Sequence, residues 1–302
     1  GDPDKMTRRL FIFGLGYSGL EIAKLARAQG FDVAGTCTTA EKAAQLRHAG
    51  FDVHLFDGTA ALPEAVLRGA SHVLCSIAPT DTGDPALHTC RALLGHAPWL
   101  GYLSTTGVYG DHGSGWVDET TPAVPGHARS IARLAAEQAW RDLARETGAT
   151  LDILRLPGIY GPGRSAIDQV KSGTARRIDK PGQFFSRIHV ADIANATLAA
   201  MVRTMGRTMA HTMAPTGATA LWNVADDLPA ANSDVVAHAF ELLGRPVPPA
   251  IPWEQIAPTL SPMAQSFYRE SRRVRNDRLK RDLGVVLRYP TYREGLKAIA
   301  EA

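Results

Sequence analysis

The sequence lacks the features that would assign it to a membrane, a secretory route or a metal site. No apolar run approaches the about 20 residues that a membrane helix needs, and no signal peptide precedes Met6. Cysteines are few, and Cys37, Cys75 and Cys90 are odd in number and show no metal-site spacing. We therefore expect buried thiols in a reducing compartment, no metal, no membrane association and a cytoplasmic location.

An excess of charge of one sign is also missing. The 33 Lys and Arg residues nearly balance the 30 Asp and Glu residues, which leaves a formal net charge of +3. No block of basic residues with interleaved aromatics is present, so nucleic acid is not an expected partner. Hydrophobic residues make up 45% of the 302 residues, and no repeat is visible. This composition predicts a globular protein with one large α/β domain, or such a domain with a smaller lobe.

A glycine-rich turn follows the first apolar run. Residues 10–13 are typical of a buried parallel strand, and Gly14, Gly16 and Gly19 then match the spacing G-x-G-x-x-G. Helical spacing continues from there to Gly30. The first glycine permits a tight turn, the second lets backbone approach a pyrophosphate, and the third lets the helix pack closely on the strand. Strand, turn and helix together predict a dinucleotide site.

The residues after this turn and after the second strand bear on the cofactor. The backbone amides of Tyr17 and Ser18 stand at the start of the expected helix, where N–H groups hold a pyrophosphate. An NAD-preferring site usually offers Asp or Glu at the end of the second strand. Here Cys37 is followed by Thr38 and Thr39, whose hydroxyls can donate to a phosphate. NADP is therefore favoured over NAD, with capping of the next helix as the alternative role of the threonines.

Strands alternate with helices along the first half of the chain. Beyond the first strand, further strands are expected at residues 32–37, 53–56, 72–77, 99–104 and 151–155. This alternation predicts an α/β fold, a doubly wound (Rossmann) parallel sheet with a smaller C-terminal substrate lobe. We expect the NAD(P)-binding domain at residues 6–223, with 157–186 contributing to the substrate lobe. Residues 224–302 are expected to form most of that lobe.

Several segments resemble one known family. They are residues 102–110 (YLSTTGVYG), 155–163 (RLPGIYGPG) and 187–193 (RIHVADI). With the glycine motif, they resemble the extended short-chain dehydrogenase/reductase family, which includes NAD(P)-dependent epimerases and dehydratases. The resemblance implies a small-molecule substrate and, because family members often dimerise through their long helices, a homodimer.

The resemblance also implies contacts with the cofactor and the substrate. Asp57 matches the position that contacts adenine in the family. Other positions that match cofactor contacts are Ser76, Ile77, Ala78, Pro157, Gly158 and Ile159. Positions that match the substrate side of the cleft are Thr106, Trp116, Arg187, His189 and Arg273. Structural roles, at the end of a strand for Thr106 and on a solvated helix face for Arg273, stay open.

The catalytic residues of the family are only partly present. Its chemistry uses a Ser or Thr, a Tyr, and a Lys four residues after the Tyr; the hydroxyl aligns with Thr105, but Tyr and Lys align with Arg129 and Arg133. A guanidinium has no transferable proton at any relevant pH, and loss of a positioned general acid costs about 10²–10⁴ in rate. Arg133 can still hold ribose hydroxyls. Arg129, one helical turn away, would point at the nicotinamide end and attract a carboxylate or phosphate.

Other residues could supply the missing proton. Tyr109, Tyr160 and His189 lie on segments that border the family's cleft, and Tyr160 is kept as a catalytic candidate. Two functions therefore stay open. One is an atypical short-chain dehydrogenase/reductase, an oxidoreductase or epimerase-like enzyme acting on a small polar substrate that is anionic or nucleotide-linked. The other is a non-catalytic regulatory protein that senses NADP(H), which needs the glycine motif but no proton donor.

Overall fold

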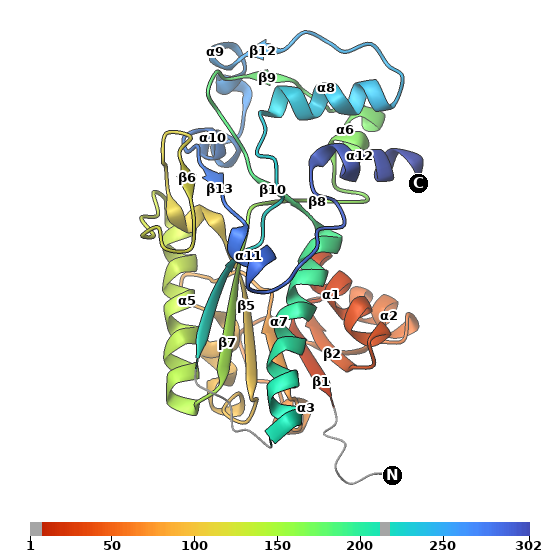
Figure 1. Ribbon diagram of the computed structural model, residues 1–302. Coiled ribbons are helices and arrows are strands. Elements are labelled where there is room, and N and C mark those ends of the chain that lie inside the picture. Colours follow the sequence, from red (N-terminus) through yellow and green to blue (C-terminus); the bar gives the residue numbers. More distant parts are fainter. Residues whose placement is uncertain (1–7, 212–217) are drawn as a thin grey trace.

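A seven-stranded sheet, parallel throughout, forms the centre of the molecule (Figure 1). The computed structural model describes residues 8–211 and 218–302, so the start expected at Met6 lies outside the described residues. The strands run in the order β11-β7-β5-β4-β1-β2-β3. Their bounds are β1 Arg9–Phe13, β2 Asp32–Cys37, β3 Asp52–Leu55, β4 His72–Cys75, β5 Trp99–Thr105, β7 Thr150–Leu156 and β11 Thr219–Asn223. The expected doubly wound α/β fold is confirmed.

Helices cover both faces of this sheet. On β1, Leu10 and Ile12 point to one face and Phe11 and Phe13 to the other, and both sets are fully buried. The first face packs on α1 Tyr17–Ala28, α2 Ala40–His48 and α7 Val190–His211. The second packs on α3 Glu64–Leu67, α4 Pro85–Cys90 and α5 Ala128–Thr147. Because neither face meets water, the strands read as continuous apolar runs in the sequence.

A second group of small elements lies beyond the ends of β5 and β7, in the upper half of Figure 1. Three short parallel strand pairs belong to it: β8 Gly158–Tyr160 with β10 Arg187–His189, β9 Ile178–Asp179 with β12 Ile251–Pro252, and β6 Trp116–Val117 with β13 Arg273–Val274. Its helices are α6 Ala166–Ser172, α8 Asn232–Leu242, α9 Trp253–Ile256, α10 Pro262–Tyr268, α11 Asp277–Arg281 and α12 Tyr292–Glu301. Two small apolar clusters, separate from the core of the sheet, hold α6, α8, α9, α10 and α12. Leu279 of α11 packs in the core of the sheet instead, and Val117 of β6 and Val274 of β13 form another small cluster with Tyr109.

The described residues were searched for a membrane-spanning helix and for a metal site. Within residues 8–211 and 218–302, no helix combines the length and apolarity that crossing a bilayer requires. In the same ranges, no group of three His, Cys, Asp or Glu side chains is placed to hold a metal ion. Cys37, Cys75 and Cys90 are all buried, as expected of structural thiols.

Candidate functional site

The glycine turn sits at the end of β1, and each glycine has a separate steric reason to be there. Gly14 has φ +97°, donates its N–H to Thr36 Oγ1 at 2.9 Å, and a Cβ there would lie 2.7 Å from Ile77 Cγ2. A Cβ on Gly19 would lie 2.1 Å from the Gly14 carbonyl oxygen. A Cβ on Gly16 would meet no atom within 4 Å. The first and third glycines are thus required by packing, whereas Gly16 borders open space.

Helix α1 begins at this open space with its N-terminus uncapped. Gly16 is the N-cap residue, no side chain accepts a hydrogen bond from the first turn, and no acidic residue lies in that turn. The positive end of the helix dipole and the N–H groups of Tyr17 and Ser18 are therefore available to an anion. An uncapped helix start beside an empty glycine position fits the pyrophosphate of a dinucleotide.

The residues at the end of β2 have mixed roles. Thr38 is exposed, whereas Thr39 caps α2, where its Oγ1 accepts the Lys42 N–H at 3.2 Å. The guanidinium of Arg47 donates twice to the Val53 carbonyl, at 2.7 and 3.2 Å. The alternative capping role therefore applies to Thr39, and Thr38 is the hydroxyl left facing solvent.

The loops after β3 and β4 lie at the same edge of the sheet as the glycine turn. Asp57 is exposed, and its Oδ1 accepts both the N–H and the hydroxyl of Thr59, which lowers its pKa and favours the carboxylate. Ser76 donates its N–H to the Phe13 carbonyl at 2.8 Å. The segment from Ser76 to Ala78, which contains Ile77, therefore lies directly against the glycine turn. The structure brings these predicted cofactor residues to one edge of the sheet.

Thr105 and Arg133 both lie near the end of β5. Thr105 Oγ1 accepts the Gly107 N–H at 3.0 Å, which leaves the hydroxyl hydrogen for another partner. Arg133 reaches from α5 to donate to the Leu103 carbonyl at 3.1 Å, and its guanidinium lies 6.0 Å from the Tyr102 ring centre. The hydroxyl and the cation are therefore gathered at the sheet edge that also carries the glycine turn. Thr106, the next residue, is only 3% exposed.

Arg129 is directed elsewhere. Its Nη2 donates to Ser266 Oγ at 3.0 Å, and its guanidinium lies 5.2 Å from the ring centre of Phe267. Both partners belong to α10. The structure therefore separates Arg129 from Arg133, although they are one helical turn apart on α5, and joins Arg129 to the second group of elements.

A buried polar network supports this end of α5. Glu137 accepts two hydrogen bonds from Arg155, at 2.7 and 3.0 Å, and a third from the Ser104 hydroxyl at 2.5 Å. The Arg155 guanidinium also lies 4.8 Å from the Tyr109 ring centre. Tyr109 itself donates to Asn223 Oδ1 at 2.7 Å. Sequence reasoning missed this network, although Glu137 stands four residues after Arg133 in the segment aligned with the family.

Tyr160, His189 and Arg187 lie together on the β8–β10 pair, where burial decides their chemistry. Burial raises the pKa of Tyr160, whose ring centre lies 5.1 Å from that of His189. Burial lowers the pKa of His189 to about 4, and its Nδ1 accepts the Ala191 N–H at 3.0 Å. Arg187 donates from Nη1 to the carbonyls of Phe185 and Ala230, at 3.0 Å each. Neither Tyr160 nor His189 is tuned to release a proton near pH 7.

Trp116 forms a second cationic cluster with two arginines. It is 42% exposed, and the guanidinium carbons of Arg273 and Arg275 lie 5.2 and 4.9 Å from its ring centre. Arg273 also lies 5.0 Å from the ring centre of Phe184. Among the residues that the structure describes, neither arginine has a carboxylate within ion-pair distance. This arrangement of an exposed indole between two unpaired cations suits a ligand that is negatively charged.

Comparison with known proteins places this site in a family context. The model of the NAD dependent epimerase/dehydratase family matches residues 84–209. The solved structure of a functionally unknown conserved protein from Silicibacter pomeroyi DSS is 42% identical, with 98% of this chain and 99% of that chain covered and a TM-score of 0.86. Protein YeeZ of Escherichia coli K12 is 31% identical over 175 residues, which cover 52% of this chain and 61% of YeeZ.

A more distant structure shares the fold. UDP-glucuronic acid 4-epimerase from Bacillus cereus, solved in complex with NAD, has a TM-score of 0.74 at 16% identity, with 97% of each chain covered. A nicotinamide cofactor, as the matched family description states, agrees with the open glycine turn and the uncapped start of α1. Residues 84–209 therefore match the NAD dependent epimerase/dehydratase family, and the whole chain shares the fold of a solved epimerase.

Proposed function

We propose that this protein is an atypical NADP(H)-dependent oxidoreductase or epimerase-like enzyme that acts on a small, polar, anionic substrate. The observation that carries the proposal is the shared edge of the sheet. There the uncapped N-terminus of α1 and the open position at Gly16 accompany the hydroxyl of Thr105 and the cation of Arg133. A bound nicotinamide dinucleotide would supply or accept a hydride at this edge.

The preference for NADP rests on the end of β2. Thr38 is exposed there, and no acidic residue follows Cys37 to claim a ribose 2′-hydroxyl. A 2′-phosphate would accept a hydrogen bond from the Thr38 hydroxyl, and Thr39 is committed to capping α2. The adenine end would lie near Asp57, and the nicotinamide end near Pro157, Gly158 and Ile159.

The roles proposed for the polar residues follow from their contacts. Thr105 would orient a substrate oxygen through its free hydroxyl hydrogen, and Arg133 would hold ribose hydroxyls of the cofactor. The proton would come from water, because Arg129 has none to give and burial holds Tyr160 protonated. The cluster of Trp116, Arg273 and Arg275 would hold the negative charge of the substrate.

The organisation of the chain is proposed on the same basis. Residues 6–223 would bind the dinucleotide, while residues 157–186 and 224–302 would build the substrate lobe. A homodimer through the long helices, as in related enzymes, and a cytoplasmic location stay predictions.

Titration calorimetry with NADPH, NADP, NADH and NAD tests the cofactor half of the proposal. We expect tighter binding of the phosphorylated pair, and at least about tenfold weaker binding in Gly16→Ala, whose new methyl group would occupy the open space. The matched control is Gly95→Ala, where a Cβ makes only an ordinary 3.7 Å contact with Thr147. Equal affinity in both variants would overturn this placement of the pyrophosphate.

Measurement of turnover tests the catalytic part of the proposal. NADPH oxidation should rise above background with some member of a panel of carbonyl compounds and sugar nucleotides. Arg133→Ala should weaken dinucleotide binding. Arg129→Ala should leave it unchanged, because the Arg129 side chain contacts α10 and not the edge of the sheet.

A non-catalytic NADP(H) sensor is the second candidate, favoured by one observation. The residue in the position of the family's proton donor contacts Ser266 and Phe267 rather than the sheet edge. If no substrate is turned over, and NADPH instead changes the association with a partner protein, the sensor function is the correct one.

A further inference from the structure

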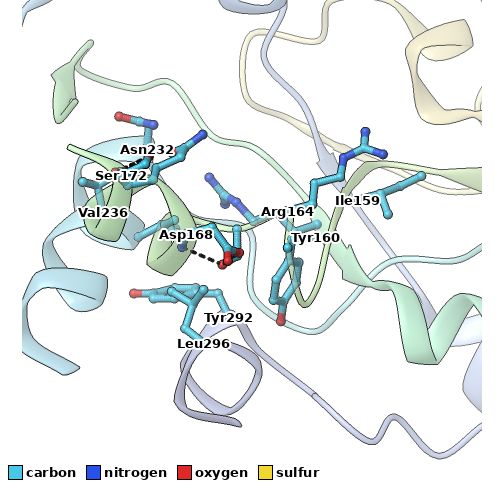
Figure 2. Close-up of a pocket in the computed structure, with 15 residues that line it drawn as sticks. Ile159, Tyr160, Arg164, Asp168, Ser172, Asn232, Val236, Tyr292 and Leu296 are labelled. Atoms are coloured by element: carbon cyan, nitrogen blue, oxygen red, sulfur yellow. Dashed lines mark hydrogen bonds between the residues drawn. The ribbon is translucent and has the colours of Figure 1, made fainter. Parts of the chain in front are cut away.

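A cavity of about 650 Å³ lies in the second group of elements (Figure 2), and neither Thr105 nor Arg133 is among the residues that line it. Helices α6, α8 and α12 and the strands β8 and β10 line it, and one side is open to solvent. Its volume falls within the range of about 300–1,000 Å³ that is usual for small-molecule sites. Of the lining residues, the function proposed above uses only Ile159, near the nicotinamide end of the cofactor, and it assigns no ligand to the rest of this space.

Two arginines line the cavity from different segments. Arg187 on β10 uses Nη1 to bond two backbone carbonyls, and none of the hydrogen bonds found among the described residues involves its Nε or Nη2. Arg164 is exposed and has no ion-pair partner in the described part of the chain. Its guanidinium lies 5.4 Å from the Tyr17 ring centre. Tyr17 in turn donates its hydroxyl to the Pro162 carbonyl at 2.9 Å, which holds the turn before Arg164 against α1.

The acidic groups nearby do not cancel these two cations. Asp168 is the one carboxylate in the lining, and its Oδ2 accepts the Ser165 hydroxyl at 2.7 Å (Figure 2). Asp226 lies close enough to Arg187 to interact with it, but burial raises its pKa to about 8, so it is mostly uncharged near pH 7. The lining therefore carries a net positive charge.

The remainder of the wall is largely apolar. Val235 and Val236 come from α8, and Leu296 from α12, while the rings of Tyr160 and Tyr292 face the same space. A ligand that fills such a cavity needs a hydrophobic body as well as a charge, because inorganic anions would leave these side chains without partners.

We propose that this cavity is a binding site for a small organic anion, with its carboxylate or phosphate between Arg164 and Arg187 and its apolar body against α8 and α12. The cavity adjoins the proposed dinucleotide site at Ile159, but neither Thr105 nor Arg133 lines it, and the proposal does not rest on hydride chemistry. Arginine suits this task because its planar guanidinium donates two parallel hydrogen bonds to such groups.

Binding measurements by saturation-transfer NMR and titration calorimetry test the proposal, with benzoate as the anionic probe and benzamide as its uncharged counterpart. Benzoate should bind saturably and benzamide at least about tenfold more weakly, because only the carboxylate forms charge-assisted bonds with arginine. Arg164→Ala should weaken benzoate binding about tenfold. Arg164 is exposed, so this variant should fold normally.

Two matched variants make the test specific. Arg176→Ala removes the same charge from an exposed position outside the lining, and should bind benzoate as the unmodified protein does. Arg273→Ala removes a cation of the Trp116 cluster and should also leave binding unchanged. The proposal is overturned if benzoate and benzamide bind alike, if Arg164→Ala binds as tightly as Arg176→Ala, or if Arg273→Ala is the variant that loses binding.

Discussion

Asp226 places a carboxyl group where it has almost no contact with water. The residue is 2% exposed, and its Oδ2 has no hydrogen-bond partner among the described residues, while Oδ1 accepts the Leu228 N–H at 3.1 Å. Burial raises its pKa from the usual 3.8 to about 8, against the opposing effect of Arg187. The folded protein therefore binds a proton that the unfolded chain releases between about pH 4 and pH 8. The free energy of unfolding falls as the pH rises through this window.

Replacement of Asp226 by Asn should remove this pH dependence. Asparagine has the shape of the protonated acid and does not ionise, so the variant should lack a slope of up to about 1.4 kcal/mol per pH unit. Its advantage over the unmodified protein should grow from pH 5 to pH 8 in urea unfolding experiments. Asp179→Asn, an exposed position, is the control and should keep the original slope. Parallel curves for the unmodified protein and Asp226→Asn would contradict the assignment.

At the scale of elements, the position of α5 depends on one buried ion pair. The side chains of Glu137 on α5 and Arg155 on β7 are 1% and 4% exposed, and two hydrogen bonds join them. Ser104 adds a third bond to Glu137 from the end of β5, next to Thr105. This pair therefore fixes the helix that carries Arg133 relative to the two strands that end at the site.

Removal of one partner should be costly because it leaves the other buried and unpaired. We expect Glu137→Ala to lower the free energy of unfolding by about 3–5 kcal/mol. The double variant Glu137→Met with Arg155→Met should be less destabilised than Glu137→Ala, since no charge is left in the interior. Glu64→Ala, which breaks the exposed pair with Arg68, should cost at most about 1 kcal/mol. Chemical unfolding of the unmodified protein and the three variants measures these free energies. A double variant less stable than Glu137→Ala would refute the prediction.

The sequence predicted an element well where residues close together in the chain determine it, and poorly where contacts between distant segments determine it. The strand at residues 32–37 was predicted with its observed bounds, because buried strands have their own periodicity. The glycine turn was likewise predicted from consecutive residues, although the contacts of Gly14 with Thr36 and Ile77 come from the tertiary structure. Two-residue strands such as β6 and β13 have no period, and pairing with distant segments creates them.

Side-chain direction was the least predictable property of the site. Spacing placed Arg129 and Arg133 on one helix face, but Ser266 and Phe267, more than 130 residues later in the chain, direct Arg129 away from the sheet edge. The cavity beside Arg164 was also invisible, since its walls come from several separated segments. Such features depend on tertiary packing, which a single sequence does not show.

At the scale of the whole molecule, α12 packs its apolar face on α6 and α8, and two further contacts tie α12 and the segment before it to other elements. Asp192 on α7 accepts the N–H groups of Arg288 and Tyr289, at 2.8 and 3.0 Å, just before α12 begins. Gly295 on α12 faces Tyr160 on β8 so closely that a Cβ would lie 1.9 Å from the phenol oxygen. The first contact joins the C-terminal segment to the helices of the sheet, and the second closes one wall of the cavity.

Gly295→Ala should therefore disturb the second group of elements without affecting the dinucleotide site. The added methyl group overpacks the contact with Tyr160, and we expect a loss of about 1–3 kcal/mol in the free energy of unfolding. Tyr160→Phe, which removes the closest atom at the expense of one long hydrogen bond to Thr291, should recover part of that loss in the double variant. NADPH affinity, measured by calorimetry, should match that of Gly95→Ala because α1 and the glycine turn make no part of this contact. A loss of NADPH binding that parallels the loss of stability would instead mean that α12 and the glycine turn unfold as one unit.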